Sequence, residues 1–293
     1  MRILLTAARG LIGSAVSAGL LADGHDVVPL VRGRAGPANR WDPGSGVLDP
    51  AVVAGYDAVI HLSGEPILGR WTAAKRRAIR ASRVDSTALL ARTLASLARP
   101  PASLLVASAV GIYGDRGEAL LTEQSAPGAD WLAGVTREWE AAAEPAARMG
   151  VRVVHLRTGL VLSRSGGALA GMLPPFRLGL GGPVGNGGQY WSWIAIDDVV
   201  GAVRHILADP GIEGPVNLTA PGAVTSREFA RTLGRVLHRP AFLPLPAPVL
   251  RLVFGAAAAT LLSGSRARPA KLIAAGYAFS YPSLEPALRR LLD

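Results

Sequence analysis

The chain has no cysteine, only two lysines, few aromatic residues and no long hydrophobic run. Without cysteine, disulfide frameworks, thiolate zinc sites, iron–sulfur clusters and cysteine nucleophiles are excluded. A membrane-spanning helix needs about 20 mostly apolar residues, and the most apolar stretch, residues 252–262, ends at Ser263. We therefore expect a buried helix there and no membrane partner. The N-terminus enters a strand pattern without a cleavage region, so we expect a cytoplasmic protein.

Positive charge is abundant but spread along the chain. The net charge is +10, and apart from Lys75 and Lys271 every basic residue other than histidine is an arginine. The one local run, from Lys75 to Arg83, has no aromatic ladder or recognition motif beside it, so we expect a solvated helix face and no nucleic-acid partner. With 49% hydrophobic and 18% charged residues in 293, the chain is a folded protein of one large domain, or of a core and a smaller cap.

Short apolar runs alternate with longer segments rich in alanine, leucine and arginine. Strands separated by helical crossovers form parallel sheets covered on both faces, so the sequence predicts a doubly wound α/β fold. Pro29 lies inside the second strand pattern, where it removes a backbone donor, and we expect a local irregularity there. The predicted strands are Arg2–Leu5, Asp26–Val31, Ala58–Leu62, Ser103–Ala107, Arg152–Leu156 and Pro215–Leu218.

The second half of the chain has a glycine-rich segment and a change of pattern. Residues 165–188 contain nine glycines and three prolines, which predicts a long loop bordering a ligand or, alternatively, a surface connection. The strand and helix alternation ends after Thr219, and residues 226–238 have helical spacing before a proline-rich link. We expect a nucleotide-binding domain over residues 1–222 and a small substrate-binding cap over residues 223–293.

A dinucleotide-loop pattern follows the first strand. The sequence TAARGLIG runs from Thr6 to Gly13, with Ala7 where a glycine-rich loop has its first glycine. Gly10 and Gly13 permit a tight turn that brings backbone N–H groups to a pyrophosphate at the positive end of the next helix. The position between strand and helix favours a cofactor loop over an ordinary turn.

The end of the second strand carries Arg32 in place of an acidic residue. It lies 19 positions after Gly13, close to the interval of about 20 at which NAD sites place a carboxylate for the ribose 2′-hydroxyl. A guanidinium suits a 2′-phosphate through charge-assisted bonds, and Arg34 follows just beyond. The sequence therefore favours NADP(H) as the cofactor. NAD(H) stays open, because the alternative interpretation of Arg32 is an ordinary surface arginine.

With these motifs, the chain resembles the extended and atypical short-chain dehydrogenase/reductases, which have a Rossmann-type fold. It is most similar to the bacterial "epimerase family" NAD(P)-dependent oxidoreductases that carry a short C-terminal domain of unknown function. The strings that carry the resemblance span almost the full length: TAARGLIG at Thr6, HLSGEPI at His61, SRVDST at Ser82, SAVGIYG at Ser108, LRTGLVL at Leu156, LPPFRLGLGGPVGNGGQ at Leu173, WIAIDDVV at Trp193 and GYAFSYP at Gly276.

The resemblance implies a cofactor site along the strand ends. The segment of Leu62, Ser63 and Gly64 would run alongside the adenosine and pyrophosphate. Arg83 would reach the cofactor from the following helix, and Arg157 would lie near the nicotinamide. The cofactor-binding residues predicted from loop and resemblance together are Thr6, Ala8, Arg9, Gly10, Leu11, Ile12, Gly13, Val31, Arg32, His61, Leu62, Ser63, Gly64, Arg83, Ala107 and Arg157.

The usual catalytic pair of that superfamily, Tyr-x-x-x-Lys, is absent. In that pair the lysine lowers the phenol pKa from about 10, so that tyrosine moves a proton while hydride passes to or from the nicotinamide. The tyrosines that would partner Lys75 and Lys271 are replaced by Trp71 and Ala267. The segment that should carry the pair, Trp131–Thr136, offers no group of suitable proton affinity.

Ser108 and Tyr113 are the remaining catalytic candidates. Ser108 lies at the end of the fourth predicted strand, and both hydroxyls could bond a substrate carbonyl. The alternative is structural, with Ser108 bonding the backbone and Tyr113 packing beneath the cofactor. Tyr190, beside the glycine-rich segment, is a weaker third candidate. Related proteins generally have histidine at the position of Ala195, and the two aspartates that follow, Asp197 and Asp198, are expected to cap the next helix.

No metal site is expected, because the five histidines lack ligand spacing. Hydrolase and NTPase motifs are also absent from the sequence. The leading hypothesis is an NADP(H)-dependent oxidoreductase acting on a small molecule. The alternatives are an NADP(H)-binding sensor or scaffold without turnover, and a nucleotide-sugar-type epimerase or dehydratase that uses the cofactor transiently. The substrate and the oligomeric state, a homodimer included, are left open by the sequence.

Overall fold

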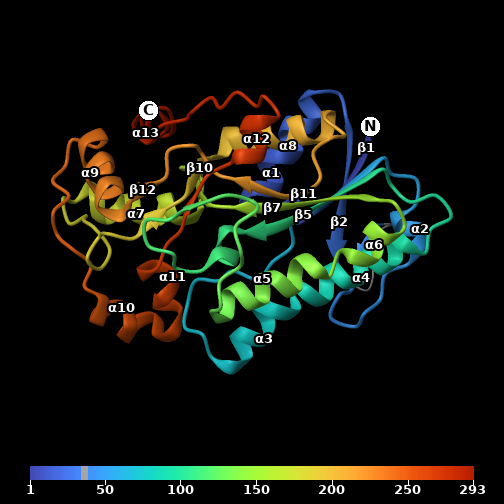
Figure 1. The fold of residues 1–293 in the computed structure, drawn as a ribbon, viewed down its shortest axis with the longest axis horizontal. Coiled ribbons are helices and arrows are strands. Elements are labelled where there is room, and N and C mark those ends of the chain that lie inside the picture. Colours follow the sequence, from blue (N-terminus) through green and yellow to red (C-terminus); the bar gives the residue numbers. More distant parts are fainter. Residues whose placement is uncertain (34–38) are drawn as a thin grey trace.

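A seven-stranded parallel sheet forms the centre of the molecule (Figure 1). The computed structural model describes residues 1–33 and 39–293. Every neighbouring pair of strands in this sheet is parallel, which confirms the predicted Rossmann-type α/β class. In spatial order the strands are β11 (Gly214–Leu218), β7 (Arg152–Thr158), β5 (Ser103–Ala109), β4 (Ala58–His61), β1 (Arg2–Thr6), β2 (Asp26–Arg32) and β3 (Arg40–Trp41).

Helices cover both faces of the sheet, which is why the central strands are apolar at successive positions. Ile3 and Leu5 of β1 face one hydrophobic cluster, whereas Leu4 faces another, because side chains alternate across a strand. In Figure 1, α1 (Leu11–Ala22), α8 (Ile196–Ala208) and α12 (Ala270–Ala274) lie above the sheet. The other face is covered by α2 (Pro50–Val53), α3 (Ala73–Ala81), α4 (Val84–Ala95), α5 (Trp131–Ala141) and α6 (Glu144–Arg148).

The strand order reverses direction beside β1. From β1 the chain proceeds outward to β2 and β3, and then returns to form β4 on the other side of β1. In open α/β sheets, ligands bind outside the carboxyl ends of the strands at such a switch point. The switch point here lies between the ends of β1 and β4, at Thr6 and His61.

Pro29 lies inside β2 without interrupting it, so the expected irregularity is wrong. The register with β1 continues from Asp26 to Leu30. The N–H groups of Val31 and Gly33 donate toward the β3 side, and Pro29 faces the same way because it precedes Val31 by two residues. The missing donor therefore faces away from β1, before the point at which the described pairing with β3 begins, at Val31 and Arg40.

The glycine-rich segment contains a helix, α7 (Gly167–Arg177), so the prediction of a loop throughout residues 165–188 is wrong. Leu169, Leu173 and Phe176 have helical spacing and are buried in one cluster. Pro174 and Pro175 lie inside the helix, which ends at Arg177. Burial of the apolar face outweighs the loss of two backbone donors in the last turns. Around α7 lie β8 (Leu160–Leu162), β9 (Tyr190–Trp191), β10 (Trp193–Ala195) and β12 (Val224–Thr225).

The C-terminal segment packs against both the sheet and α7. Helix α9 (Ser226–Val236) confirms the helical spacing seen in the sequence and carries a capping box between Thr225 and Glu228. Helix α13 (Leu284–Leu292) joins the cluster of α7 and α9, whereas Leu272 of α12 belongs to the cluster between the sheet, α1 and α8. The division between residues 222 and 223 stays a prediction. Small elements complete the chain: 3₁₀ turns at Val110–Tyr113 and Gly255–Ala258, β6 (Leu120–Leu121), α10 (Ala247–Phe254), α11 (Ala259–Leu262) and β13 (Arg266–Ala267).

Residues 252–262 do not form the single buried helix expected from their composition. The stretch is divided among the end of α10, a 3₁₀ turn and α11, and Leu252 is 76% exposed. Gly255, with φ of 56°, ends α10. Across the described ranges, no helix combines the length and the apolarity needed to cross a bilayer.

Gly13 tests how tightly α1 packs on the turn that precedes it. A Cβ at this position would overlap the carbonyl oxygen of Ala7, so we expect Gly13→Ala to lower the free energy of unfolding by about 1–3 kcal/mol. Gly134→Ala in α5, where a Cβ meets nothing closer than 3.9 Å, should instead raise it by about 0.5–1 kcal/mol. Urea unfolding measures both variants, and an unchanged midpoint for Gly13→Ala would contradict the close approach.

Candidate functional site

The turn between β1 and α1 has the geometry of a phosphate-binding loop. Ala7 has a φ of 54°, the left-handed region in which glycine is usual. Gly10 donates its N–H to the Ala7 carbonyl at 2.9 Å, and α1 begins at the next residue. The first N–H groups of a helix have no acceptor within it, and no acidic side chain lies in the first turn of α1. The start of α1 therefore presents backbone donors of positive partial charge beside this turn.

A hydrogen-bonded chain ties the end of β4 to the end of β1. The N–H of Leu62 donates to Thr6 Oγ1 at 2.9 Å, and that hydroxyl lies 3.0 Å from His61 Nδ1. His61 Nε2 lies 3.3 Å from Ser86 Oγ. Burial lowers the pKa of His61 to about 3, so the ring is neutral. Thr6 and His61 are completely buried, and they fix the segment Leu62–Gly64 beside the loop rather than reaching the surface themselves.

Basic side chains gather at the end of β2. Val31 and Arg32 are exposed, and among the described residues no carboxylate lies within ion-pair distance of Arg32. The Arg40 guanidinium lies against Gly33, and its Nε is buried without a hydrogen-bond partner within residues 1–33 and 39–293. Arg34 lies outside the described residues. The strand end where a dinucleotide places its adenosine ribose is therefore cationic.

Arg83 lies at the same edge of the sheet, over Gly64. Its Nη1 donates to the carbonyls of Glu65 and Ile79, at 2.9 and 3.2 Å, and the guanidinium carbon lies 5.2 Å from the centre of the Trp139 ring. Burial lowers the pKa of Arg83 to about 10, with the charge of Glu65 opposing this. The side chain is cationic at neutral pH and lies next to the segment predicted to pass the pyrophosphate.

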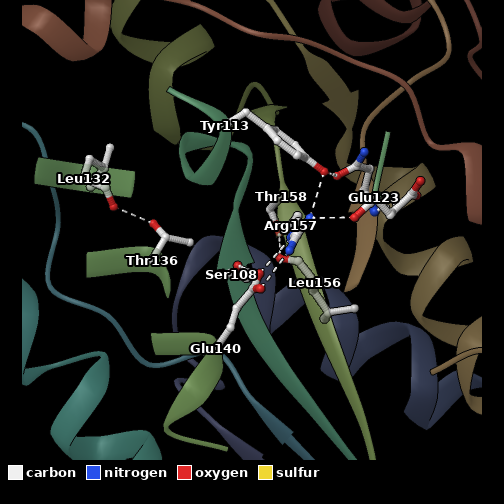
Figure 2. A network of polar contacts seen from close by, with 10 residues as sticks. Ser108, Tyr113, Glu123, Leu132, Thr136, Glu140, Leu156, Arg157 and Thr158 are labelled. Atoms are coloured by element: carbon white, nitrogen blue, oxygen red, sulfur yellow. Dashed lines mark hydrogen bonds and ion pairs between the residues drawn. The ribbon is translucent and has the colours of Figure 1, made fainter. Parts of the chain in front are cut away.

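A buried ion pair holds the Ser108 hydroxyl (Figure 2). Arg157 donates from Nε and Nη2 to the two carboxylate oxygens of Glu140, at 2.8 and 2.9 Å. Ser108 Oγ donates to the same carboxylate at 2.6 Å. Burial alone would raise the pKa of Glu140, but the hydrogen bonds and charge of Arg157, with the Ser108 bond, hold it below its usual value. The same pairing raises the pKa of Arg157 against the effect of its burial.

Tyr113 belongs to the other end of this network. Its hydroxyl donates to Asn217 Oδ1 at 2.7 Å and accepts from Arg157 Nη1 at 3.1 Å. Burial raises the pKa of Tyr113, and Arg157 opposes this only in part. The phenol is fully buried and stays protonated at neutral pH. Arg157 also donates to the Glu123 carbonyl, so its guanidinium faces protein groups on several sides.

Three members of the network, Glu140, Asn217 and Glu123, were not predicted from the sequence. Ser108 and Arg157 are paired across β5 and β7, whereas Glu140 comes from α5 and Asn217 from β11. Glu140 follows Thr136 by four residues on one helix face. A carboxylate on the face of a helix that covers the sheet was the signal in the sequence that could have identified Glu140. The Thr136 hydroxyl, by contrast, bonds the Leu132 carbonyl of its own helix.

The two aspartates at the start of α8 do not cap it, so that expectation is wrong. The N-cap residue is Ala195, which has no side-chain acceptor. Asp198 is fully buried and accepts hydrogen bonds from the Tyr277 hydroxyl and from the N–H groups of Ser280 and Tyr281. It therefore fixes the C-terminal segment to α8. Tyr190 lies under the Arg266 guanidinium, 5.0 Å from its ring centre.

The described residues fit an adenine dinucleotide. The loop 7–13 offers backbone donors, the segment 62–64 passes the switch point, and Arg32 is exposed at the strand end. Ala8, Arg9, Leu11, Ile12 and Ala107 lie at the same edge with partial or full exposure. No group of three histidine, aspartate or glutamate side chains suited to a metal ion occurs in the part of the chain that the structure describes.

Glu140→Gln tests the buried pair. The substitution leaves the Arg157 charge unpaired, so at pH 7 we expect a loss of about 3 kcal/mol in the free energy of unfolding. A lowered carboxyl pKa stabilises the fold above its unfolded value of 4.5, and this contribution is lost as pH falls through the folded pKa. The difference between wild type and variant should therefore shrink below pH 4.5 in urea unfolding. Exposed Glu118→Gln is the control, and a difference independent of pH would refute the ion pair.

Two family profiles match the chain and cover most of it. Residues 3–218 match the NAD dependent epimerase/dehydratase family, and residues 245–291 match a domain of unknown function, DUF1731. The first match includes the loop, the switch point and the network around Arg157.

Relatives match over the full length. Epimerase family protein Mb2239 of Mycobacterium bovis is 42% identical over 98% of this chain and 96% of its own length. The human epimerase family protein SDR39U1 is 38% identical over the whole of both chains. The crystal structure of human SDR39U1 isoform 2 with NADPH has a TM-score of 0.89 and 36% identity, covering 99% of each chain. UDP-N-acetylglucosamine 4-epimerase of Bacillus cereus, at 16% identity and a TM-score of 0.76, shares the fold. The chain therefore belongs to the NAD dependent epimerase/dehydratase family and carries the domain of unknown function DUF1731 near its C-terminal end.

Proposed function

We propose that the protein is an NADP(H)-dependent oxidoreductase that acts on a small molecule. The observation that carries the preference for the phosphorylated cofactor is Arg32 at the end of β2, where an NAD site would have a carboxylate. Arg32 is exposed and has no carboxylate partner among residues 1–33 and 39–293. A guanidinium there offers paired donors to a 2′-phosphate. The NADPH in the human SDR39U1 structure supports the same preference.

The bound cofactor would supply or accept a hydride, and the protein would supply orientation and the proton. Ser108 is the candidate for bonding a substrate carbonyl, but its one hydrogen is donated to Glu140. The hydroxyl must therefore turn away from Glu140 before it can donate to a carbonyl. Tyr113 is buried with both of its hydrogen-bonding roles in use, so a catalytic role for it requires the network to open.

A specific observation favours a second candidate function, cofactor binding without turnover. Among the described residues, neither lysine is hydrogen-bonded to a tyrosine: Lys75 Nζ is paired with Glu65, at 2.7 Å, and Lys271 Nζ donates to the Glu213 carbonyl. A sensor or scaffold would retain the NADP(H) site and lack the proton-transfer group. The cytoplasmic location and a homodimeric state also stay predictions.

Arg32→Asp tests the cofactor preference. Replacing the guanidinium by a carboxylate removes two charge-assisted bonds to the 2′-phosphate and adds repulsion, so we expect the Kd for NADPH to rise by roughly 10–100-fold. The Kd for NADH should change much less. Calorimetric titration of both nucleotides measures the two effects. Arg99→Asp, an exposed position just before β5 at the opposite edge of the sheet, is the matched control. Equal losses for NADPH and NADH would defeat the assignment to Arg32.

Ser108→Ala separates an enzyme from a sensor. NADPH consumption is measured over a panel of aldehydes and ketones, and the variant is tested on any compound that the wild type reduces. We expect kcat to fall by roughly 10²–10⁴-fold while the Kd for NADPH changes less than about twofold, because Ser108 is not predicted to contact the cofactor. Unchanged turnover would remove Ser108 from the mechanism. A panel without any turnover would favour the sensor.

A further inference from the structure

A largely apolar cavity of about 320 Å³ lies in the part of the molecule that carries α7 and α9. Its size is at the lower end of the range of roughly 300–1,000 Å³ found for small-molecule sites. Its walls come from α7, from residues 180–184 of the glycine-rich segment, from α9 and from residues 243–245. In Figure 1 these elements gather at one end of the sheet, beside β10 and β12.

The glycines and prolines of this region build one wall of the cavity. The N–H of Leu243 donates to the Gly181 carbonyl at 3.1 Å, and the N–H of Leu245 donates to the Pro183 carbonyl at 2.9 Å. A Cβ at Gly181 would overlap the Phe176 ring, and a Cβ at Gly182 would overlap the Leu243 backbone. The glycine-rich segment and the proline-rich link are therefore joined closely, and the wall is fixed by backbone contacts.

The lining is aromatic and aliphatic. Phe176, Trp191 and Phe229 contribute rings, and the last two pack edge to face with centroids 5.2 Å apart. Among the described lining residues the polar side-chain groups are the indole N–H of Trp191 and the hydroxyl of Ser226, and no charged side chain is present. The Ser226 oxygen already accepts the Val184 N–H at 3.0 Å. A phosphate or carboxylate placed here would lose its hydration without gaining a partner of opposite charge. The lining thus favours an uncharged ligand with a large apolar part.

Helix α7 joins this cavity to the dinucleotide loop. A Cβ at Gly167, the first residue of α7, would lie 3.0 Å from Leu11 at the start of α1. Gly171, one turn later, lines the cavity. The cavity therefore begins about one helical turn, roughly 5.4 Å, from the residues that contact the loop.

We propose that this cavity binds the apolar body of an uncharged small molecule, an aromatic or alicyclic carbonyl compound or the corresponding alcohol. This identification of the substrate class rests on the proposed function, whereas the binding of an apolar ligand in the cavity does not. A nucleoside diphosphate sugar is disfavoured as the occupant, because the lining offers no cation to its phosphates.

The test uses N-phenyl-1-naphthylamine, a neutral aromatic probe whose emission rises in apolar surroundings, with the full-length protein in the absence of nucleotide. We expect saturable binding of one probe per chain and energy transfer from tryptophan that falls in Trp191→Phe. NADPH should leave the affinity for the probe unchanged within about twofold, because the two sites are separate. Displacement of the probe by NADPH, or by UDP-glucose, would overturn the proposal.

Gly171→Leu supplies the decisive variant. A Cβ at Gly171 meets nothing within 4 Å, so a side chain can begin there without a clash. Because Gly171 lines the cavity, we expect a leucine at this position to occupy part of its volume. Leucine also favours a helix over glycine by roughly 0.8 kcal/mol, so thermal stability should not fall. We expect the Kd for the probe to rise at least 10-fold, whereas Gly171→Ala, the matched control with one added methyl group, should change it less than about threefold. Equal probe binding by wild type and Gly171→Leu, or no saturable binding by the wild type, would overturn the proposal. Since no cofactor is present, that failure is distinct from a failure of the NADPH titrations.

Discussion

The turn from β1 into α1 closes only because residue 13 has no side chain. The Ala7 carbonyl occupies the space that a Cβ would fill, and its oxygen at the same time accepts the Gly10 N–H. This contact brings the start of α1 directly over the end of β1. The bonds from Thr6 to His61 and Leu62 then place the next strand end beside it. The backbone donors, the switch point and Arg32 share one edge of the sheet as a consequence of this packing.

A second constraint acts deeper in the same edge, where the carboxylate of Glu140 is shared by Arg157 and Ser108. A buried guanidinium requires a partner of opposite charge. Because Glu140 is that partner, its carboxylate also fixes the orientation of the Ser108 hydroxyl. The superfamily's tyrosine and lysine pair would put a cation beside a phenol in order to lower its pKa. Here the cation, Arg157, is paired with the carboxylate of Glu140. Burial raises the pKa of Tyr113, and Arg157 opposes this only in part. An ionised Tyr113 phenol is therefore disfavoured at this edge at neutral pH.

The sequence predicted the features that depend on local pattern. Alternation of apolar strands and helices identified the parallel sheet, and the glycine spacing identified the loop. Features that depend on tertiary partners were missed. Helix α7 forms despite Pro174 and Pro175 because its apolar face is buried, and Asp198 bonds the distant segment 277–281 rather than its own helix. Glu140 was missed for the same reason, since its partners come from two strands.

The cavity beside α7 accounts for glycine in segment 180–184, because a Cβ at Gly182 would overlap the Leu243 backbone where the two segments are hydrogen-bonded. The central claim remains that Arg32 binds the 2′-phosphate of a dinucleotide at the switch point. A crystal structure of the protein with NADPH tests it most directly. The account predicts the 2′-phosphate within hydrogen-bond distance of the Arg32 guanidinium and the pyrophosphate on the N–H groups at the start of α1. A nucleotide bound elsewhere, or a 2′-phosphate directed away from Arg32, would contradict it.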